Sequence, residues 1–277
     1  MQTKVRQFSV IVIMTLLAIS TGYAGTSKEG NEKIGSHIVT SDTILSGMIA
    51  SLLPPSRYSA EAVLPPGQCP GHYDVKLSDI QKIKTADLVV SFKGMPFMEK
   101  AGPGGKAQFL VDAGARNWMA PDSYIYGLGV LAQALSIFFP KDKDEILRRE
   151  EDSILEVKRG TNGLVEKIKQ SKIFGKPMIA SSMQKEPLEW MGFHVVGEYG
   201  RQEAISAREL VRLIEIGKAQ KAIMVVDNLQ SGPEGGKGIA ETLGVPHVIL
   251  TNFPTEKGYL ATLAENINTV LAAAKKE

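Results

Sequence analysis

A charged segment from Lys141 to Ser171 divides this chain of 277 residues into two halves, and Pro140 marks where the segment begins. Its apolar positions are Ile146, Ile154, Leu155, Val157, Leu164, Val165 and Ile168. This pattern predicts one long amphipathic helix, bent or interrupted between Gly160 and Gly163. A single long helix between the two halves argues against wide hinge bending.

On both sides of this helix, short β-rich runs alternate with apolar helical segments. The β-rich runs cover residues 37–40, 58–63, 87–91 and 108–111 before the helix, and 177–180, 194–196, 222–226 and 247–250 after it. Alternating strands and helices indicate parallel sheets with helices on both faces. We therefore expect an α/β fold with two βα lobes, joined by one long rigid α-helix. We place the N-terminal lobe at residues 34–139, the connecting helix at 140–174 and the C-terminal lobe at 175–277.

The N-terminus has the pattern of an export signal. Lys4 and Arg6 precede an apolar run over residues 8–19, and small residues follow as far as Ala24. This order is typical of a secretory signal peptide, here residues 1–24, followed by a polar tether over residues 25–33. The apolar run is shorter than the ~20 residues of a membrane span, so an uncleaved anchor is the lesser alternative. The sequence thus predicts an exported protein.

The composition excludes some partners. The net charge is only +2 and no Lys/Arg run stands out, so we expect no nucleic-acid binding. The single cysteine, Cys69, cannot form an internal disulfide in an exported chain. It is therefore a bystander thiol, a partner for another molecule or a soft metal ligand.

Cys69 belongs to a Pro/Gly-rich loop over residues 63–75 that follows a predicted strand and also contains His72. Ligands of parallel α/β proteins bind at the carboxyl ends of the strands. His72 alone among the four histidines follows a strand, which favours a role in ligand binding. The other three begin predicted strands and should be solvated or hydrogen-bonded at the opposite edges, and they are His37, His194 and His247.

A metal site needs three or four convergent donors. Cys69, His72 and Asp122 could supply a thiolate, an imidazole and a carboxylate, although Asp122 could equally cap the helix that follows Pro121. Other positions expected in the cleft are Met95, Met98, Ser181, Ser182, Met183 and Asn252. The methionines are more often packing residues, but a site where several of them converge on Cys69 would be soft and would favour copper(I)-like ions over manganese.

Two enzymatic interpretations fail on spacing. Two residues in a Pro-Gly turn separate Cys69 from His72, and no third group can be named to orient the histidine, so we expect no enzyme. The segment 231–238 joins a strand to a helix, but Gly238 stands where a phosphate loop needs a hydroxyl, so we expect no nucleotide.

Several spaced segments occur in an order that resembles one known family. They are Pro66-Gly67, Pro70-Gly71-His72-Tyr73, Leu77-Ser78-Asp79 and Ala86-Asp87-Leu88-Val89. From residue 34 to 275 the chain is similar to periplasmic substrate-binding proteins of zinc and manganese ABC transporters, solute-binding family 9 (cluster A-I). The resemblance implies two lobes joined by a long helix, with a zinc-like cargo metal held between them by three histidines and an acid. It also implies a membrane permease as partner.

The ligand positions of that family transfer only in part. His72 matches the first histidine, and Asp122 occupies the place of the second. Ser181, Ser182 and Met183 stand where the third belongs, and Asn252 stands where the acid belongs. Three functions are compatible with this sequence. In the first, the chain is a monomeric binding protein that delivers a transition metal to a permease. In the second, the same scaffold binds a metal chelate or a small organic molecule, and in the third the chain is a non-transport adhesin or interaction protein.

Overall fold

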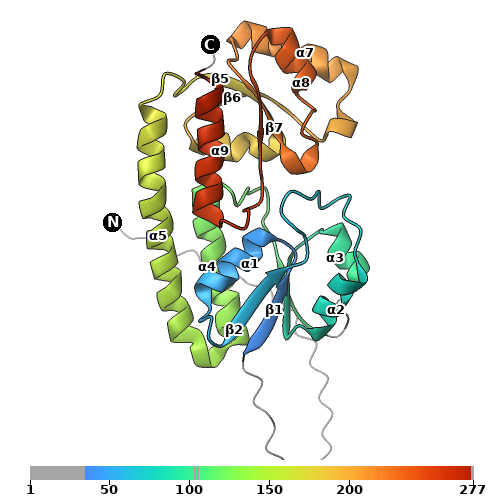
Figure 1. Ribbon diagram of the computed structural model, residues 1–277, viewed down its shortest axis with the longest axis vertical. Helices are drawn as coiled ribbons and strands as arrows, with labels where there is room; N and C mark the ends of the chain where they lie inside the picture. The colour runs from blue at the N-terminus through green and yellow to red at the C-terminus, as the bar shows by residue number, and fades with distance from the viewer. Residues whose placement is uncertain (1–34, 103, 105, 276–277) are drawn as a thin grey trace, which may run out of the picture. The chain divides into compact units, whose positions relative to one another are not determined.

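The computed structural model describes residues 35–102, 104 and 106–275, which belong to one compact unit. The predicted signal peptide and tether lie outside the described residues. Within this unit the two predicted parallel sheets are present (Figure 1). The strands of one sheet precede the long connecting helix in the sequence, and the strands of the other follow it.

The N-terminal sheet contains β1 (Ser36–Thr40), β2 (Tyr58–Ala62), β3 (Leu88–Phe92) and β4 (Ala107–Val111). Its spatial order is β2-β1-β3-β4, and every pair is parallel. The central strand β3 is apolar along most of its length because helices cover it, and Leu88, Val89 and Val90 are buried. The strand β4 lies at the edge, and its Leu110 is exposed.

The C-terminal sheet repeats this arrangement. It contains β5 (Pro177–Ser181), β6 (His194–Tyr199), β7 (Val225–Asn228) and β8 (His247–Leu250), in the order β6-β5-β7-β8 with all pairs parallel. The α/β class with two βα lobes is confirmed.

The helices of the N-terminal lobe are α1 (Thr43–Leu52), α2 (Leu77–Thr85), α3 (Pro96–Ala101) and α4 (Pro121–Phe138). After the connecting helix α5 (Lys143–Lys169), the C-terminal lobe adds α6 (Lys185–Trp190), α7 (Ala207–Gln220), α8 (Lys237–Leu243) and α9 (Tyr259–Ala273). Across the described residues, no helix combines the length and apolarity that crossing a membrane requires.

The connecting helix α5 is continuous, so the expected interruption between Gly160 and Gly163 is wrong. A Cβ atom placed on Gly160 would lie 2.7 Å from Cδ1 of Leu260 in α9. The glycine therefore permits close packing of α9 on α5 and does not break the helix. Figure 1 shows α5 alongside α4 and α9, and contacts join it to both.

One hydrophobic core runs through both lobes. It joins Met48 of α1 and Leu131 of α4 to Val157 of α5, and continues to Leu263 of α9 and Val226 of β7. The long helix is thus held along its length by both halves of the chain, in agreement with the expected rigidity.

Candidate functional site

Loops at the carboxyl ends of the two sheets contact each other. Thr43, beyond β1, donates its hydroxyl to the carbonyl of Pro254, beyond β8, over 2.7 Å. The Tyr259 hydroxyl donates to the carbonyl of Met119 over 3.1 Å, and its ring stacks on Tyr124 with centroids 3.7 Å apart. Burial raises the pKa of both tyrosines, so their hydroxyls stay neutral donors. The strand polarity predicted from the sequence therefore brings the loops of the two lobes together.

Asn117, beyond β4, makes several of the hydrogen bonds that join the two lobes. Its side-chain amide donates to Oδ1 of Asn252 over 2.6 Å and to the carbonyl of Met183. Its backbone N–H donates to the carboxylate of Glu186, and its own Oδ1 accepts from the N–H of Met119 over 2.9 Å. Two positions expected to bind ligand, Met183 and Asn252, thus have polar groups engaged in joining the lobes. Glu186 was missed because it lies within a helix and belongs to no motif.

The loop with Cys69 and His72 faces a C-terminal segment that sequence reasoning did not single out. Nη1 of Arg201, just beyond β6, donates to Sγ of Cys69 over 3.2 Å. Oε1 of Glu203 lies 4.0 Å from Nε2 of His72 and 4.0 Å from Nη1 of Arg201. The His72 side chain is 71% exposed, whereas Cys69 is half-buried. Both predicted donors therefore lie where the lobes meet.

Asp122, the third predicted donor, belongs to the helix α4. It is exposed in the first turn of α4, whose N-cap is Ala120, so Asp122 is not the cap that the sequence allowed. Within the part of the chain that the structure describes, no three His, Cys, Asp or Glu side chains are grouped closely enough to hold a metal ion. The assignment of Cys69, His72 and Asp122 as a ligand set stays a prediction.

The C-terminal side of the site is built from hydroxyls and amides. Ser181 is buried with its Oγ 3.5 Å from Oγ of Ser231, which also accepts from Nδ2 of Asn228 over 3.0 Å. Buried Gln184 donates to Oδ1 of Asn228 over 2.9 Å, while its own Oε1 has no hydrogen-bond partner among the described residues. Ser182 is exposed beside them. Hydroxyl and amide oxygens are poorer ligands for a borderline ion such as zinc than the imidazole nitrogens expected in the family.

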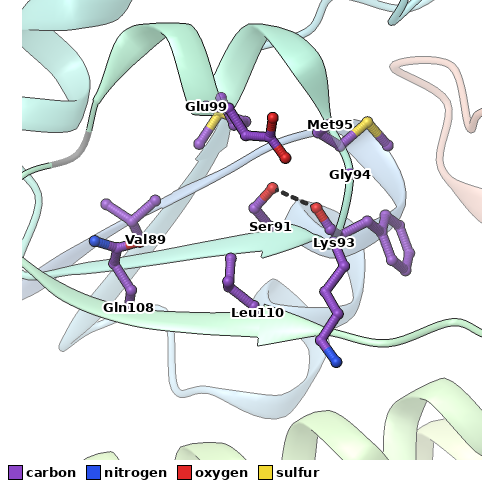
Figure 2. A pocket seen from close by; sticks show the side chains of 10 residues that line it. Val89, Ser91, Lys93, Gly94, Met95, Glu99, Gln108 and Leu110 are labelled. Atoms are coloured by element: carbon purple, nitrogen blue, oxygen red, sulfur yellow. Dashed lines mark hydrogen bonds between the residues drawn. The ribbon is translucent and has the colours of Figure 1, made fainter. Parts of the chain in front are cut away.

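Met95 and Met98 line a pocket of about 290 Å³ in the N-terminal lobe. Figure 2 shows this pocket between α3 and the strands β3 and β4, with Leu110 on its strand side and Glu99 reaching from the helix. The dashed line in Figure 2 is the bond from the Ser91 hydroxyl to the carbonyl of Phe92, 2.9 Å long. The two thioethers thus belong to a largely apolar pocket built within one lobe.

The remaining histidines lie as predicted, at the starts of strands. Nδ1 of His37 is 3.0 Å from Oγ of Ser59 and its Nε2 is 3.0 Å from Glu61. Nε2 of His247 is 2.6 Å from Oδ2 of Asp227, and His194 is exposed. Hydrogen bonding or solvent satisfies each of them, as expected for residues at the far edges of the sheets.

Two parallel sheets whose carboxyl-end loops meet, with one long helix packed along both halves, define a two-lobed α/β protein. The chain belongs to the family described as zinc-uptake complex component A, periplasmic (ZnuA), whose model matches residues 38–273. No curated protein matches the chain.

Solved structures share the fold at low sequence identity. The manganese-bound periplasmic metal-binding protein of Candidatus Liberibacter asiaticus has a TM-score of 0.71 and 13% identity, over 86% of this chain and 99% of that chain. The laminin-binding protein Lmb of Streptococcus agalactiae, a bifunctional adhesin and metal transporter, has a TM-score of 0.70 and 16% identity, over 87% and 100%. The zinc-binding protein TroA of Treponema pallidum has a TM-score of 0.68 and 14% identity, over 87% and 99%.

Proposed function

We propose that this chain is the substrate-binding protein of an ABC importer, and that it captures a transition metal between its lobes and delivers it to a membrane permease. The observation that carries the proposal is the position of Cys69 and His72, which lie where the carboxyl-end loops of the two lobes meet. Membership of a periplasmic metal-binding family supports it. The predicted signal peptide over residues 1–24 would bring the chain to the periplasm.

The metal in this proposal is the cargo, so the protein needs selective and reversible capture and no catalysis. Cys69 would supply a thiolate and His72 an imidazole, which together suit zinc, cadmium or copper(I) better than manganese. Asp122 is the third donor that we propose from the sequence. Ser181, Ser182, Met183 and Asn252 would surround the metal as neutral contacts.

A metal chelate is the second candidate cargo, and one observation favours it. The described residues contain no group of three strong donors, whereas hydroxyls and amides gather on the C-terminal side. A chelated metal brings its own donors and needs from the protein only one or two metal ligands together with hydrogen bonds. The two cargoes differ in a measurable way, because a chelate would bind where the free ion does not.

Zinc or cadmium chloride is expected to bind the purified protein at about one ion per chain. Cys69→Ser and His72→Ala should each weaken that binding about tenfold or more, since each removes a strong donor. Asp122→Ala should weaken it as well if this carboxylate is the third ligand. Isothermal titration calorimetry with elemental analysis measures both affinity and stoichiometry.

His194→Ala is the matched control, because it removes an exposed histidine from the opposite edge of a sheet and should leave affinity unchanged. If no free ion binds near stoichiometry but its citrate complex raises the melting temperature, the chelate is the cargo. The transport proposal itself is lost if neither free nor chelated metals bind.

A further inference from the structure

Arg201 places a positive charge against the sulfur that a cargo metal would have to reach. Its Nη1 donates to Sγ of Cys69 over 3.2 Å, which joins the C-terminal lobe to the N-terminal loop. Glu203, the nearby carboxylate, is 4.0 Å from the same nitrogen, beyond hydrogen-bond distance. The guanidinium is therefore hydrogen-bonded to the thiol, whereas the carboxylate interacts with the guanidinium only through charge.

The loop is shaped to accept the guanidinium. A Cβ atom placed on Gly71 would lie 3.0 Å from Nη1, 3.2 Å from Nη2 and 3.3 Å from Cζ of Arg201. Gly71 is not among the glycines with positive φ, so its backbone would tolerate a side chain and only space forbids one. Glycine at this position thus allows the guanidinium to approach the loop next to Cys69.

Contacts within the C-terminal lobe also fix the position of Arg201. It precedes the short 3-10 turn Gln202–Ala204, and Gly232 packs so closely on Gln202 that a Cβ there would lie 2.6 Å away. The loop containing Gly232 is anchored by the N–H of Gly236, which donates to the buried carboxylate of Asp227 over 2.9 Å. The segment that carries Arg201 is therefore positioned by the interior of the C-terminal lobe.

We propose that Arg201 is a specificity-determining residue, a tethered cation that a metal must displace from Cys69. This inference rests on the proposed function, in which Cys69 binds the cargo. When a metal arrives, its bond to sulfur forms, the thiol proton passes to water, and the N–H···S hydrogen bond breaks. The guanidinium then moves away from the metal, since two cations repel each other at one sulfur.

This displacement separates metals by their affinity for sulfur. Cadmium, zinc and copper(I) form strong bonds to thiolate and can replace the guanidinium. Manganese and magnesium prefer oxygen and gain too little from sulfur, so they would have to bind beside a guanidinium that stays in place and repels them. Arg201 therefore provides specificity by weakening the binding of manganese and magnesium, and not by strengthening the binding of cadmium, zinc or copper(I). Loading also breaks the contact between Arg201 and the Cys69 loop, so loaded and empty protein differ at the junction of the lobes.

The test compares cadmium chloride and manganese chloride on the reduced full chain by isothermal titration calorimetry. Arg201→Gln should strengthen manganese binding more than cadmium binding and reduce the cadmium-to-manganese affinity ratio about tenfold. Gly71→Ala, which pushes the guanidinium away without removing it, should shift the ratio in the same direction. Arg208→Gln removes an equal charge from an exposed position in α7 and should leave the ratio unchanged.

Three outcomes decide the matter. An unchanged ratio in folded Arg201→Gln or Gly71→Ala overturns the inference, and so does a loss of cadmium binding, which would make Arg201 a support for the site. The ultraviolet thiolate-to-cadmium band shows whether Cys69 is the ligand in each variant. If Cys69→Ser binds both metals like the wild type, the proposed role of Cys69 fails independently of Arg201.

Discussion

Replacement of Asp227 by alanine is expected to lower the free energy of unfolding by about 3–5 kcal/mol. This carboxylate is 0% exposed, and it accepts from the Tyr199 hydroxyl over 2.6 Å and from the N–H of Gly236 over 2.9 Å. It also lies 2.6 Å from Nε2 of His247. Alanine would leave several buried donors without an acceptor at once. Urea denaturation followed by circular dichroism at neutral pH measures the loss.

Asp112→Ala is the control for this prediction. Asp112 is an exposed carboxylate that pairs with Lys93 over 2.9 Å, and water can replace that partner, so no measurable change in stability is expected. Asp227→Asn should fall between the two variants, because its amide oxygen can still accept from Tyr199 but its NH₂ group cannot accept from Gly236. An Asp227→Ala protein as stable as the wild type would contradict the network described for β7.

The second large effect concerns Asp42 and pH. Burial raises the pKa of this carboxyl from 3.8 to about 6, although hydrogen bonds from Ser41, Leu45 and Ile44 oppose the shift. The folded protein therefore binds the proton more tightly than the unfolded chain between these values. The stabilisation is fully present below about pH 4 and is lost as the pH rises through 6. The loss amounts to about 3 kcal/mol, at roughly 1.4 kcal/mol per pKa unit.

Asp42→Asn isolates this contribution. Asp42 caps α1 by accepting from the N–H groups of Ile44 and Leu45, and an asparagine oxygen can accept both bonds without titrating. Its NH₂ group can donate to the hydroxyl of Ser41, which now donates to Oδ2 of Asp42 over 2.6 Å. The difference in unfolding free energy between variant and wild type should grow from pH 4 to pH 7. Parallel pH profiles for the two proteins would refute the assignment.

The fold could be predicted from local patterns, because the periodicity of apolar residues and the order of strands and helices depend on residues that are close in the sequence. The β-rich run over residues 87–91 became β3, one position later, and the starts of strands correctly placed His37, His194 and His247 at the far edges. The same local reasoning was wrong about Gly160. Its meaning depends on Leu260, a residue of another helix that no window around position 160 contains.

Only the part of the site that belongs to the N-terminal lobe was predictable from the sequence. Strand polarity correctly brought the loop of Cys69 and His72 to the junction of the lobes, yet their partners Arg201 and Glu203 belong to no motif. Arg201 lies 132 positions from Cys69, so their contact depends on how the two sheets face each other. The role of Asn117 in joining the lobes was not predictable either, because a lone amide in a loop carries no signal of its bonding partners.

The hydrophobic core that continues from α1 through α5 to β7 has a consequence for how such a protein can diversify. Neither half can be exchanged as a module, since each would leave part of the shared apolar surface uncovered. We therefore expect one cooperative melting transition for both lobes. New cargo preferences can arise instead from single replacements in the loops beyond the strands, at positions such as 69, 72 and 201. His72 and Arg201 are exposed and Cys69 is half-buried, so a change of side chain at these positions leaves the shared core intact.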